Sequence, residues 1–549
     1  MNTLNLNGSL FANMVKGGAA NLGRSRTIVN ELNVFPIPDG DTGDNMYMTI
    51  DSGASAVPSG DEAGLEEVSA KIAKGMLLGA RGNSGVILSR IFAGIADGFL
   101  GSESVDVKTF GAALEKGVAE AYGAVSVPVE GTMLTVYRDA VRYANDRIVA
   151  GMTFENYFEM FLTELRESLE RTPELLAVLK EAGVVDSGGA GIVYIAEGME
   201  RALQGEIITD GAVTSEHKPL DLSAFGEDSV LEFGYCTEFL LQLQSAKVDL
   251  ATFDEKVIID HLVSVGESVV AFREGSILKV HVHTMTPGEI LNYCQQFGEF
   301  LTLKVENMTL QHNEKTAKQG YVPEKRKAHK PYGSVAVASG AGLCETFLSL
   351  GTDYVVEGGQ SMNPSAEDFI RAFDEVGADV IFVFPNNGNV VLTAKQAASL
   401  YEKSDIRVIE THTIGEGYAA LSMMDTGSGD TDAIEAELVA ATEGVVTGMV
   451  SKASRDTDMG EVHVVAGDYI GFAHGEVYSD AATCYEAALA LADALGAKQY
   501  DIILLFCGAE ADAEEAKRLY ETLKQTYRRA DVIMMDGGQP IYDYMMILE

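Results

Sequence analysis

The chain has 549 residues, of which 46% are hydrophobic and 22% are charged, and its formal net charge is −42. These proportions are typical of a globular protein, and the length exceeds what one hydrophobic core usually supports. Because strong negative charge repels the phosphates of nucleic acids, we expect no nucleic-acid partner. The acidity suits a basic protein partner, or it simply keeps the protein in solution.

The cysteine pattern argues against a disulfide framework. The number is odd and the spacing is wide, with members at Cys236, Cys294, Cys344, Cys484 and Cys507. This pattern is typical of the reducing cytoplasm, where we place the protein. The N-terminus lacks the basic and apolar regions of a signal peptide, and no apolar run is long enough for an integral membrane segment.

Residues 1–205 show helical periodicity and predict a helical domain. The predicted helices are connected by joints rich in Gly, Pro, Ser, Asp or Asn. After a first helix that starts near Leu10, the helical stretches are 64–77, 85–99, 108–124, 134–150, 154–180 and 191–203. The joints that carry the unusual residues are 36–45, 79–85, 126–132 and 184–191.

Residues 225–312 alternate in the manner of strands and predict a small α/β middle domain. The expected strands lie at 239–244, 268–272 and 277–283, with helices at 254–262 and 287–297. Residues 313–332 are basic in an otherwise acidic chain and predict a linker. This linker either docks on an acidic neighbour or is a solvated tether.

Residues 333–549 alternate regularly between strands and helices, which predicts a parallel α/β domain. Strands are expected at 334–338, 353–356, 380–384, 407–410, 501–506 and 531–535. A hairpin is expected at 461–478, and helices at 480–495 and 512–527.

An acidic loop carries the first sign of chemistry. Asp39 and Asp41 are separated by Gly40, and Asp44 follows in the same loop. Clustered carboxylates repel one another and favour a cation, and oxygen ligands on a rigid loop suit Mg²⁺. Pro-Asp-Gly-Asp is also ordinary turn chemistry, so from the acids alone both interpretations stay open.

Three further loops favour a nucleotide site. The segments 79–85, 130–133 and 186–191 are rich in small residues, and each precedes a predicted helix. Such loops present bare N–H groups and the positive end of a helix dipole to phosphate. Gly and Ser also serve as caps, and no segment matches the Walker pattern, so each loop alone is weak evidence.

Together, the motifs at 30–46, 79–85, 131–133 and 186–188 resemble the DhaL-type nucleotide-binding domain of the dihydroxyacetone kinase superfamily. The resemblance implies a barrel of antiparallel helices whose loop end holds ATP and two Mg²⁺. It implies that Asp39 and Asp41 are catalytic and ligate magnesium. The nucleotide-binding residues implied are Asn33, Thr42, Gly43, Asp44, Asn45, Gly82, Asn83, Ser84, Thr132, Met133, Asp186, Ser187 and Gly188.

Two positions depart from that pattern. Asn33 stands where dihydroxyacetone kinases have an acid, which leaves the third metal ligand unassigned. Asp44 stands where a Thr or a small residue is expected, and it would add charge near the phosphates.

A second metal site is a hypothesis for the middle domain. His281 and His283 are two residues apart on a predicted strand and therefore share a face, and Cys236 lies in Gly-Tyr-Cys-Thr-Glu. A thiolate and two imidazoles suit Zn²⁺, although two surface histidines and an unrelated cysteine would look the same.

The whole chain resembles the three-domain DAK-phosphatase-like family, which includes the catalytic subunit of bacterial fatty acid kinase. The C-terminal motifs 358–365 and 384–389 are similar to a two-lobed DegV-like α/β fold, although both motifs could be ordinary helix caps. The resemblance implies an ATP-dependent phosphotransferase that makes acyl phosphate, for phospholipid synthesis, from a fatty acid presented by a separate DegV-type carrier protein.

Two alternative functions remain: a dihydroxyacetone-type small-molecule kinase, and a non-catalytic nucleotide-binding scaffold. We expect partner docking rather than lipid binding by the C-terminal domain. The sequence leaves open whether the protein is a homodimer.

Overall fold

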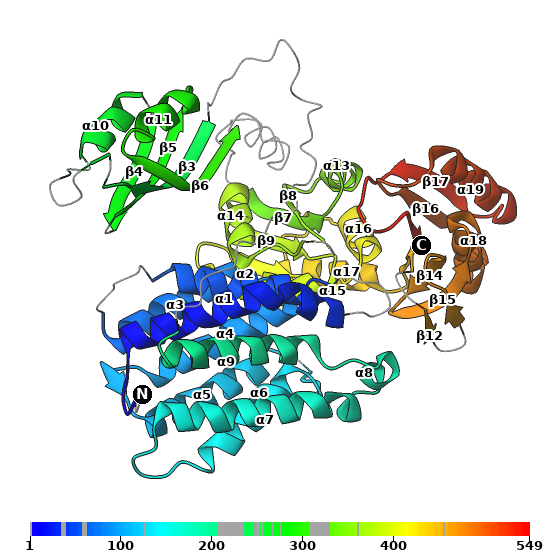
Figure 1. The fold of residues 1–549 in the computed structure, drawn as a ribbon. Helices are drawn as coiled ribbons and strands as arrows, with labels where there is room; N and C mark the ends of the chain where they lie inside the picture. The colour runs from blue at the N-terminus through cyan, green and yellow to red at the C-terminus, as the bar shows by residue number, and fades with distance from the viewer. Residues whose placement is uncertain are drawn as a thin grey trace. The chain divides into compact units, whose positions relative to one another are not determined.

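The computed structural model describes residues 3–33, 40–57, 63–125, 127–206, 235–245, 247–248, 253, 256–265, 267–274, 276–307, 330–359, 362–453, 456–459 and 462–549. The chain forms two compact units (Figure 1). The first combines Met1–Val213 with Lys327–Glu549, and the second is Thr214–Arg326. Asp39 and most of the predicted linker lie outside the described residues.

The N-terminal part of the first unit is helical, as the periodicity predicted (Figure 1). Its helices are α1 (Gly8–Leu32), α2 (Thr42–Ser55), α3 (Leu65–Gly79), α4 (Gly82–Gly98), α5 (Val107–Gly123), α6 (Met133–Asn145), α7 (Phe154–Leu175), α8 (Ala177–Ala182) and α9 (Ser187–Leu203). The all-α prediction misses one short pairing, in which β1 (Leu6–Asn7) runs antiparallel to β2 (Ser104–Val105). The predicted helix 154–180 is also interrupted, because Leu176 adopts an extended backbone between α7 and α8.

Small and aromatic residues decide how these helices pack. A Cβ on Gly17 of α1 would lie 2.7 Å from the carbonyl oxygen of Gly198 of α9, so glycine permits a close approach of the two backbones. Stacked and edge-on rings fill the core elsewhere, with Phe110 in contact with both Phe99 and Phe154. The packing leaves polar loops at the helix ends.

The C-terminal part of the first unit contains two sheets. The first is parallel, with strand order β10-β9-β7-β8, and the second is mixed, with order β15-β14-β11-β18-β16-β17. The first has strands β7 (Lys330–Ala338), β8 (Tyr354–Glu357), β9 (Ala378–Phe384) and β10 (Asp405–Val408). The second has β11 (Val446–Lys452), β14 (Tyr469–Ala473), β15 (Glu476–Ala481), β16 (Ile502–Cys507), β17 (Asp531–Asp536) and β18 (Tyr544–Leu548), beside the short pair β12 (Thr457–Met459) and β13 (Val462–Val464).

Helices connect these strands. They are α13 (Ala341–Ser349), α14 (Ala366–Val376), α15 (Gly388–Leu400), α16 (Ile414–Ser422), α17 (Thr431–Thr442), α18 (Cys484–Ala494) and α19 (Ala513–Thr526), with a 3₁₀ turn η1 (Ala497–Gln499). The prediction of parallel α/β structure is confirmed for the first sheet. It is wrong for most of the second sheet, in which β18 runs antiparallel to both of its neighbours, β11 and β16. The pair β16 and β17 is parallel, as predicted.

The second unit is a small α/β domain, as predicted. Its sheet has the order β4-β5-β3-β6 with antiparallel neighbours. The strands are β3 (Tyr235–Leu243), β4 (Glu267–Glu274), β5 (Ile277–Thr284) and β6 (Gly298–Asn307), and the helices are α10 (Lys256–Val265) and α11 (Pro287–Cys294). Phe239, Leu241, Leu278 and Val280 bury the core of this unit.

Two further findings concern the end of the predicted linker and the search for membrane-spanning helices. Residues 330–332, the end of the predicted linker, belong to strand β7. Within the described part of the chain, no helix has the length and apolar character required to cross a membrane.

Candidate functional site

A pocket of about 350 Å³ lies where the N-termini of α2, α4, α6 and α9 meet. Eleven of the residues proposed from the sequence line it, although they come from separate segments. They are Asn33, Asp41, Thr42, Asn45, Asn83, Ser84, Thr132, Met133, Asp186, Ser187 and Gly188. The remaining lining residues are Ile87, Val125, Val127, Val129, Leu134, Asn389 and Leu392.

Asp41 occupies the N-cap position of α2 and is 8% exposed. Its Oδ2 accepts a hydrogen bond from the Nδ2 of Asn363, which belongs to the C-terminal part of the chain. Asn45, one helical turn further along α2, is also buried and lines the pocket. The pocket therefore contains a buried carboxylate held by a neutral donor.

Asp44 does not line the pocket. Its Oδ2 accepts a hydrogen bond of 2.8 Å from the Nδ2 of Asn30, and its Oδ1 lies 3.6 Å from the guanidinium of Arg26. The Oδ1 of Asn30 accepts the backbone N–H of Gly43 at 2.7 Å. The negative charge of Asp44 is thus compensated at the first turn of α2, where the helix dipole also favours it.

Gly43 and Gly82 are not in the described lining of the pocket either. The backbone N–H of Gly43 donates to Asn30, and the backbone of Gly82 lies close to Asn45. Gly82 has φ +58°, and a Cβ there would lie 2.6 Å from the Nδ2 of Asn45. Glycine at this position therefore lets the start of α4 approach Asn45 closely.

Asp186 lines the pocket as the N-cap of α9. Its Oδ2 accepts the backbone N–H of Gly189 at 2.6 Å. Burial raises the pKa of Asp186 to about 6, although its hydrogen bonds with the backbone of Gly189 and Met133 act in the opposite direction. The hydroxyl of Ser187 donates to the hydroxyl of Thr42 at 3.4 Å and so connects the starts of α9 and α2.

The residues present fit a magnesium–nucleotide group. The N-caps of α4 and α6, Arg81 and Thr132, make no side-chain hydrogen bond to their helices, so the first-turn N–H groups there have no side-chain cap. Such N–H groups bind phosphate. The Oδ1 atoms of Asn83, which lines the pocket, and of Asn363, whose amide donates to Asp41, are buried without a hydrogen-bond partner among the described residues, and amide oxygens are ligands that suit magnesium.

An apolar wall completes the pocket and was not predicted from the sequence. Val125, Val127 and Val129 come from the joint before α6, and Val127 is 75% exposed. Exposed valines beside polar helix ends suit the faces of a nucleotide base. The sequence signal of the joint 126–132 lies in its small and polar residues, and the valines between them give no signal of their own.

The C-terminal part supplies Asn389, which was not assigned to this pocket from the sequence. The Nδ2 of Asn83 donates to the Oδ1 of Asn389 at 3.3 Å.

The alternative interpretation of the C-terminal motifs as helix caps is confirmed. Ser365 forms a capping box with Asp368 at the start of α14, and Asn387 caps α15.

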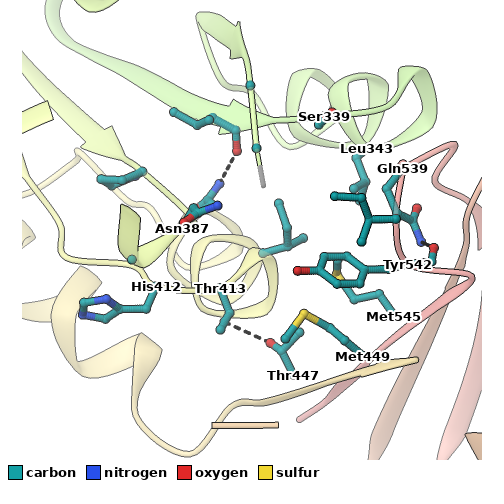
Figure 2. Close-up of a pocket in the computed structure, with 18 of the residues that line it drawn as sticks. Ser339, Leu343, Asn387, His412, Thr413, Thr447, Met449, Gln539, Tyr542 and Met545 are labelled. Carbon is teal, nitrogen blue, oxygen red and sulfur yellow. Dashed lines mark hydrogen bonds between the residues drawn. The ribbon is translucent and has the colours of Figure 1, made fainter. Parts of the chain in front are cut away.

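A second cavity, of about 130 Å³, lies in the C-terminal part (Figure 2). Tyr542, Met449 and Met545 gather on one side of it, and the hydroxyl of Thr447 donates to that of Thr413 at 3.0 Å (Figure 2). No Asp, Glu, Lys or Arg is among its described lining residues. The residues that follow β9 contribute to both cavities: Pro385–Gly388 line this one, and Asn389, in the first turn of α15, lines the helical pocket.

The proposed zinc site lies on strands β3 and β5 of the second unit. The register pairs Cys236 with His283 and Glu238 with His281. The side chains of Cys236, His281 and His283 are outside what the structure describes. No group of three metal-ligating side chains occurs among the described residues, and zinc stays a prediction.

With this geometry established, comparisons with known proteins identify the class of protein. Residues 36–201 match the model of the DAK2 domain. Residues 232–315 match the middle-domain model of the FakA-like fatty acid kinase family, and residues 333–549 match the C-terminal model of the same family. The helical pocket thus belongs to a DAK2 domain, which is followed by two domains of the FakA-like type.

The family follows from the relatives. Protein YloV of Bacillus subtilis is 37% identical over 559 residues and covers 100% of both chains. An uncharacterized protein of Staphylococcus haemolyticus is 35% identical and covers 99% of both. The chain belongs to the FakA-like family of fatty acid kinase proteins.

Solved structures give weaker similarity. The dihydroxyacetone kinase from C. freundii, in complex with AMP-PNP and Mg²⁺, is 21% identical with a TM-score of 0.27, and the match covers 35% of this chain and 33% of that one. The Streptococcus pneumoniae Fatty Acid Kinase B3 protein, loaded with linoleic acid, is 16% identical with a TM-score of 0.30, over 40% of this chain and 99% of that one.

Proposed function

We propose that this chain is the ATP-dependent catalytic component of a fatty acid kinase, which works in the cytoplasm on a fatty acid presented by a separate DegV-type carrier protein. The observation that supports it most is the pocket itself. Four helix N-termini bring Asp41, Asn83, Thr132 and Asp186 together around about 350 Å³. This arrangement suits the triphosphate of a nucleotide.

We assign a role in nucleotide and magnesium binding to each group of the pocket from its chemistry. The helix N-termini at Gly82–Ser84 and Met133 would hold phosphate oxygens, and the valine wall would contact the base. Asp41 would ligate magnesium together with Asp39, which lies outside the described residues. When bound, magnesium would neutralise charge that develops on the transferred phosphoryl group.

The chemistry requires positioning rather than covalent catalysis. A carboxylate oxygen of the fatty acid attacks the γ-phosphorus, and the bond from that phosphorus to the β–γ bridging oxygen breaks. ADP leaves with the bond's electron pair, and the product is an acyl phosphate. The protein's contribution is to fix the phosphates in line and to provide N–H donors to their oxygens.

A coupled assay tests the proposal. The full-length protein is mixed with ATP, Mg²⁺ and a DegV-type protein loaded with fatty acid, and acyl phosphate is trapped with hydroxylamine. We expect hydroxamate only when the loaded carrier is present, and a loss of at least about 100-fold for Asp41→Ala. Equal turnover without a carrier, phosphorylation of dihydroxyacetone, or unchanged activity of Asp41→Ala would contradict the proposal.

A further inference from the structure

The contact between Asn363 and Asp41 joins two parts of the sequence that are 322 residues apart. Asn363 lies between β8 and α14 and is 1% exposed. Its Nδ2 donates to the Oδ2 of Asp41 at 2.5 Å. A buried amide placed on a buried carboxylate restricts the orientation of that carboxylate.

The segment that carries Asn363 is fixed against the start of α4. The Nη1 of Arg81 donates to the carbonyl oxygen of Asn363 at 2.8 Å and lies 3.7 Å from the carboxylate of Asp368. The backbone N–H of Ala366 donates to the carbonyl oxygen of Ala80 at 3.3 Å, beside an isolated bridge between Arg81 and Ser365. These contacts hold the Asn363 backbone, so its side chain reaches Asp41 from a defined position.

We propose that Asn363 is a positioning residue of the phosphoryl-transfer site, so that the C-terminal part of the chain completes the magnesium site in cis. This inference rests on the proposed function. Outer-shell partners that orient a metal ligand typically contribute about 10- to 100-fold to metal affinity. The Oδ1 of Asn363, which is buried and has no hydrogen-bond partner among the described residues, adds an acceptor on the same amide.

The amide is suited to this role because it is neutral. It donates to Asp41 without cancelling the carboxylate charge that a divalent cation requires. An aspartate at position 363 would have the same shape but would place a second carboxylate against Asp41, where like charges repel.

Gln396 provides a matched control for simple packing. It is also an amide from the C-terminal part, it is 2% exposed, and its Nε2 donates to the carbonyl oxygen of Leu77 at 2.6 Å. Like Asn363, it is absent from the described lining of the helical pocket, but its amide donates to α3, whereas that of Asn363 donates to Asp41. Gln396→Ala removes a buried contact between the same two parts of the chain without touching the carboxylate.

The test measures binding of AMP-PNP to the full-length chain by calorimetry over a range of Mg²⁺ concentrations, without a carrier. We expect Asn363→Ala to raise the half-saturating Mg²⁺ concentration about 10-fold or more, with Gln396→Ala within about twofold of the wild type. An unchanged or lower magnesium requirement for Asn363→Ala, or an equal shift for Gln396→Ala, overturns the inference while the proposed function stands. Absence of nucleotide binding by the wild type overturns both.

Discussion

Asp44 accepts a hydrogen bond of 2.8 Å from the Nδ2 of Asn30 at the first turn of α2, and neither residue of this pair is in the described lining of the pocket. The same asparagine accepts the backbone N–H groups of Gly43 and Asp44 through its Oδ1. Asp44, the acid that departs from the kinase pattern, therefore lies in the first turn of α2 and stabilises the start of that helix. Asp41 and Asp44, which the sequence placed in one acidic loop, therefore have different roles. Asp41 lines the pocket, and Asp44 stabilises the start of α2.

Asp44→Ala should lower stability without removing nucleotide binding. The carboxylate is 40% exposed, so we discount its ion pair for solvent screening and expect a loss of only about 0.5–1 kcal/mol in the free energy of unfolding. AMP-PNP affinity should change by no more than about threefold, since Asp44 does not line the pocket. Denaturant unfolding and calorimetry measure the two quantities. A loss of binding as large as that of Asp41→Ala would contradict this assignment.

Asp186→Asn should stabilise the protein at pH 8 and have little effect at pH 4. The pKa of the carboxyl is about 6 in the folded chain, above its ordinary value of 3.8, so the folded state binds more protons between these values. The contribution of Asp186 to the stability of the wild type therefore falls as pH rises through this window. The asparagine removes a cost of up to about 3 kcal/mol at pH 8 and retains an oxygen that can cap α9.

Asp106 gives a control of opposite sign. It caps α5, and its hydrogen bond from the backbone of Thr109 lowers its pKa. The stabilisation is present above the unfolded pKa of 3.8 and is lost as pH falls through the lower folded pKa, so Asp106→Asn should destabilise at pH 8 more than at about pH 2. Thermal unfolding of both variants from about pH 2 to pH 8 checks the pair. A shift for Asp186→Asn that is independent of pH would refute the burial argument.

Gly82→Ala should disturb both stability and nucleotide binding. The residue has φ +58°, and the new Cβ would meet Asn45 at 2.6 Å, so we expect a loss of about 1–3 kcal/mol. Gly101 has φ +74° with nothing within 4 Å of its Cβ position, so Gly101→Ala isolates the cost of the backbone conformation. AMP-PNP affinity should fall for Gly82→Ala alone. Equal effects of the two substitutions on affinity would exclude crowding at Asn45 as the cause.

The full-length protein should contain about one zinc ion per chain if the middle-domain prediction holds. The register pairs Cys236 with His283 on neighbouring strands, and a thiolate and two imidazoles are zinc ligands. Elemental analysis after dialysis measures the content, and Cys236→Ser or His281→Ala should reduce it to background. Substitution of the buried Cys294, which lies on α11, should leave it unchanged. A wild-type chain without zinc would end this prediction.

Much of the candidate site could be located from the sequence, because the signals are local. Caps, tight turns and helix starts depend on a few neighbouring residues, and segments such as Gly79–Gly85 and Asp186–Gly191 carry them in order. The same logic predicted the parallel strands around β7 and β9. It failed for β11 and β18, whose antiparallel pairing depends on a partner distant in the chain.

The order of amino acids was enough to indicate that acidic and glycine-rich loops begin several helices of this protein, and that these helices precede two α/β domains. Which side chains meet depends instead on how the whole chain packs. Packing turned Asp44 toward Arg26 and Asn30, and it brought Asn363 to Asp41 and Asn389 to the pocket of the N-terminal helices. The physical reason is that caps and turns are short-range interactions, whereas a contact across 322 residues exists only when two separately built surfaces pack together.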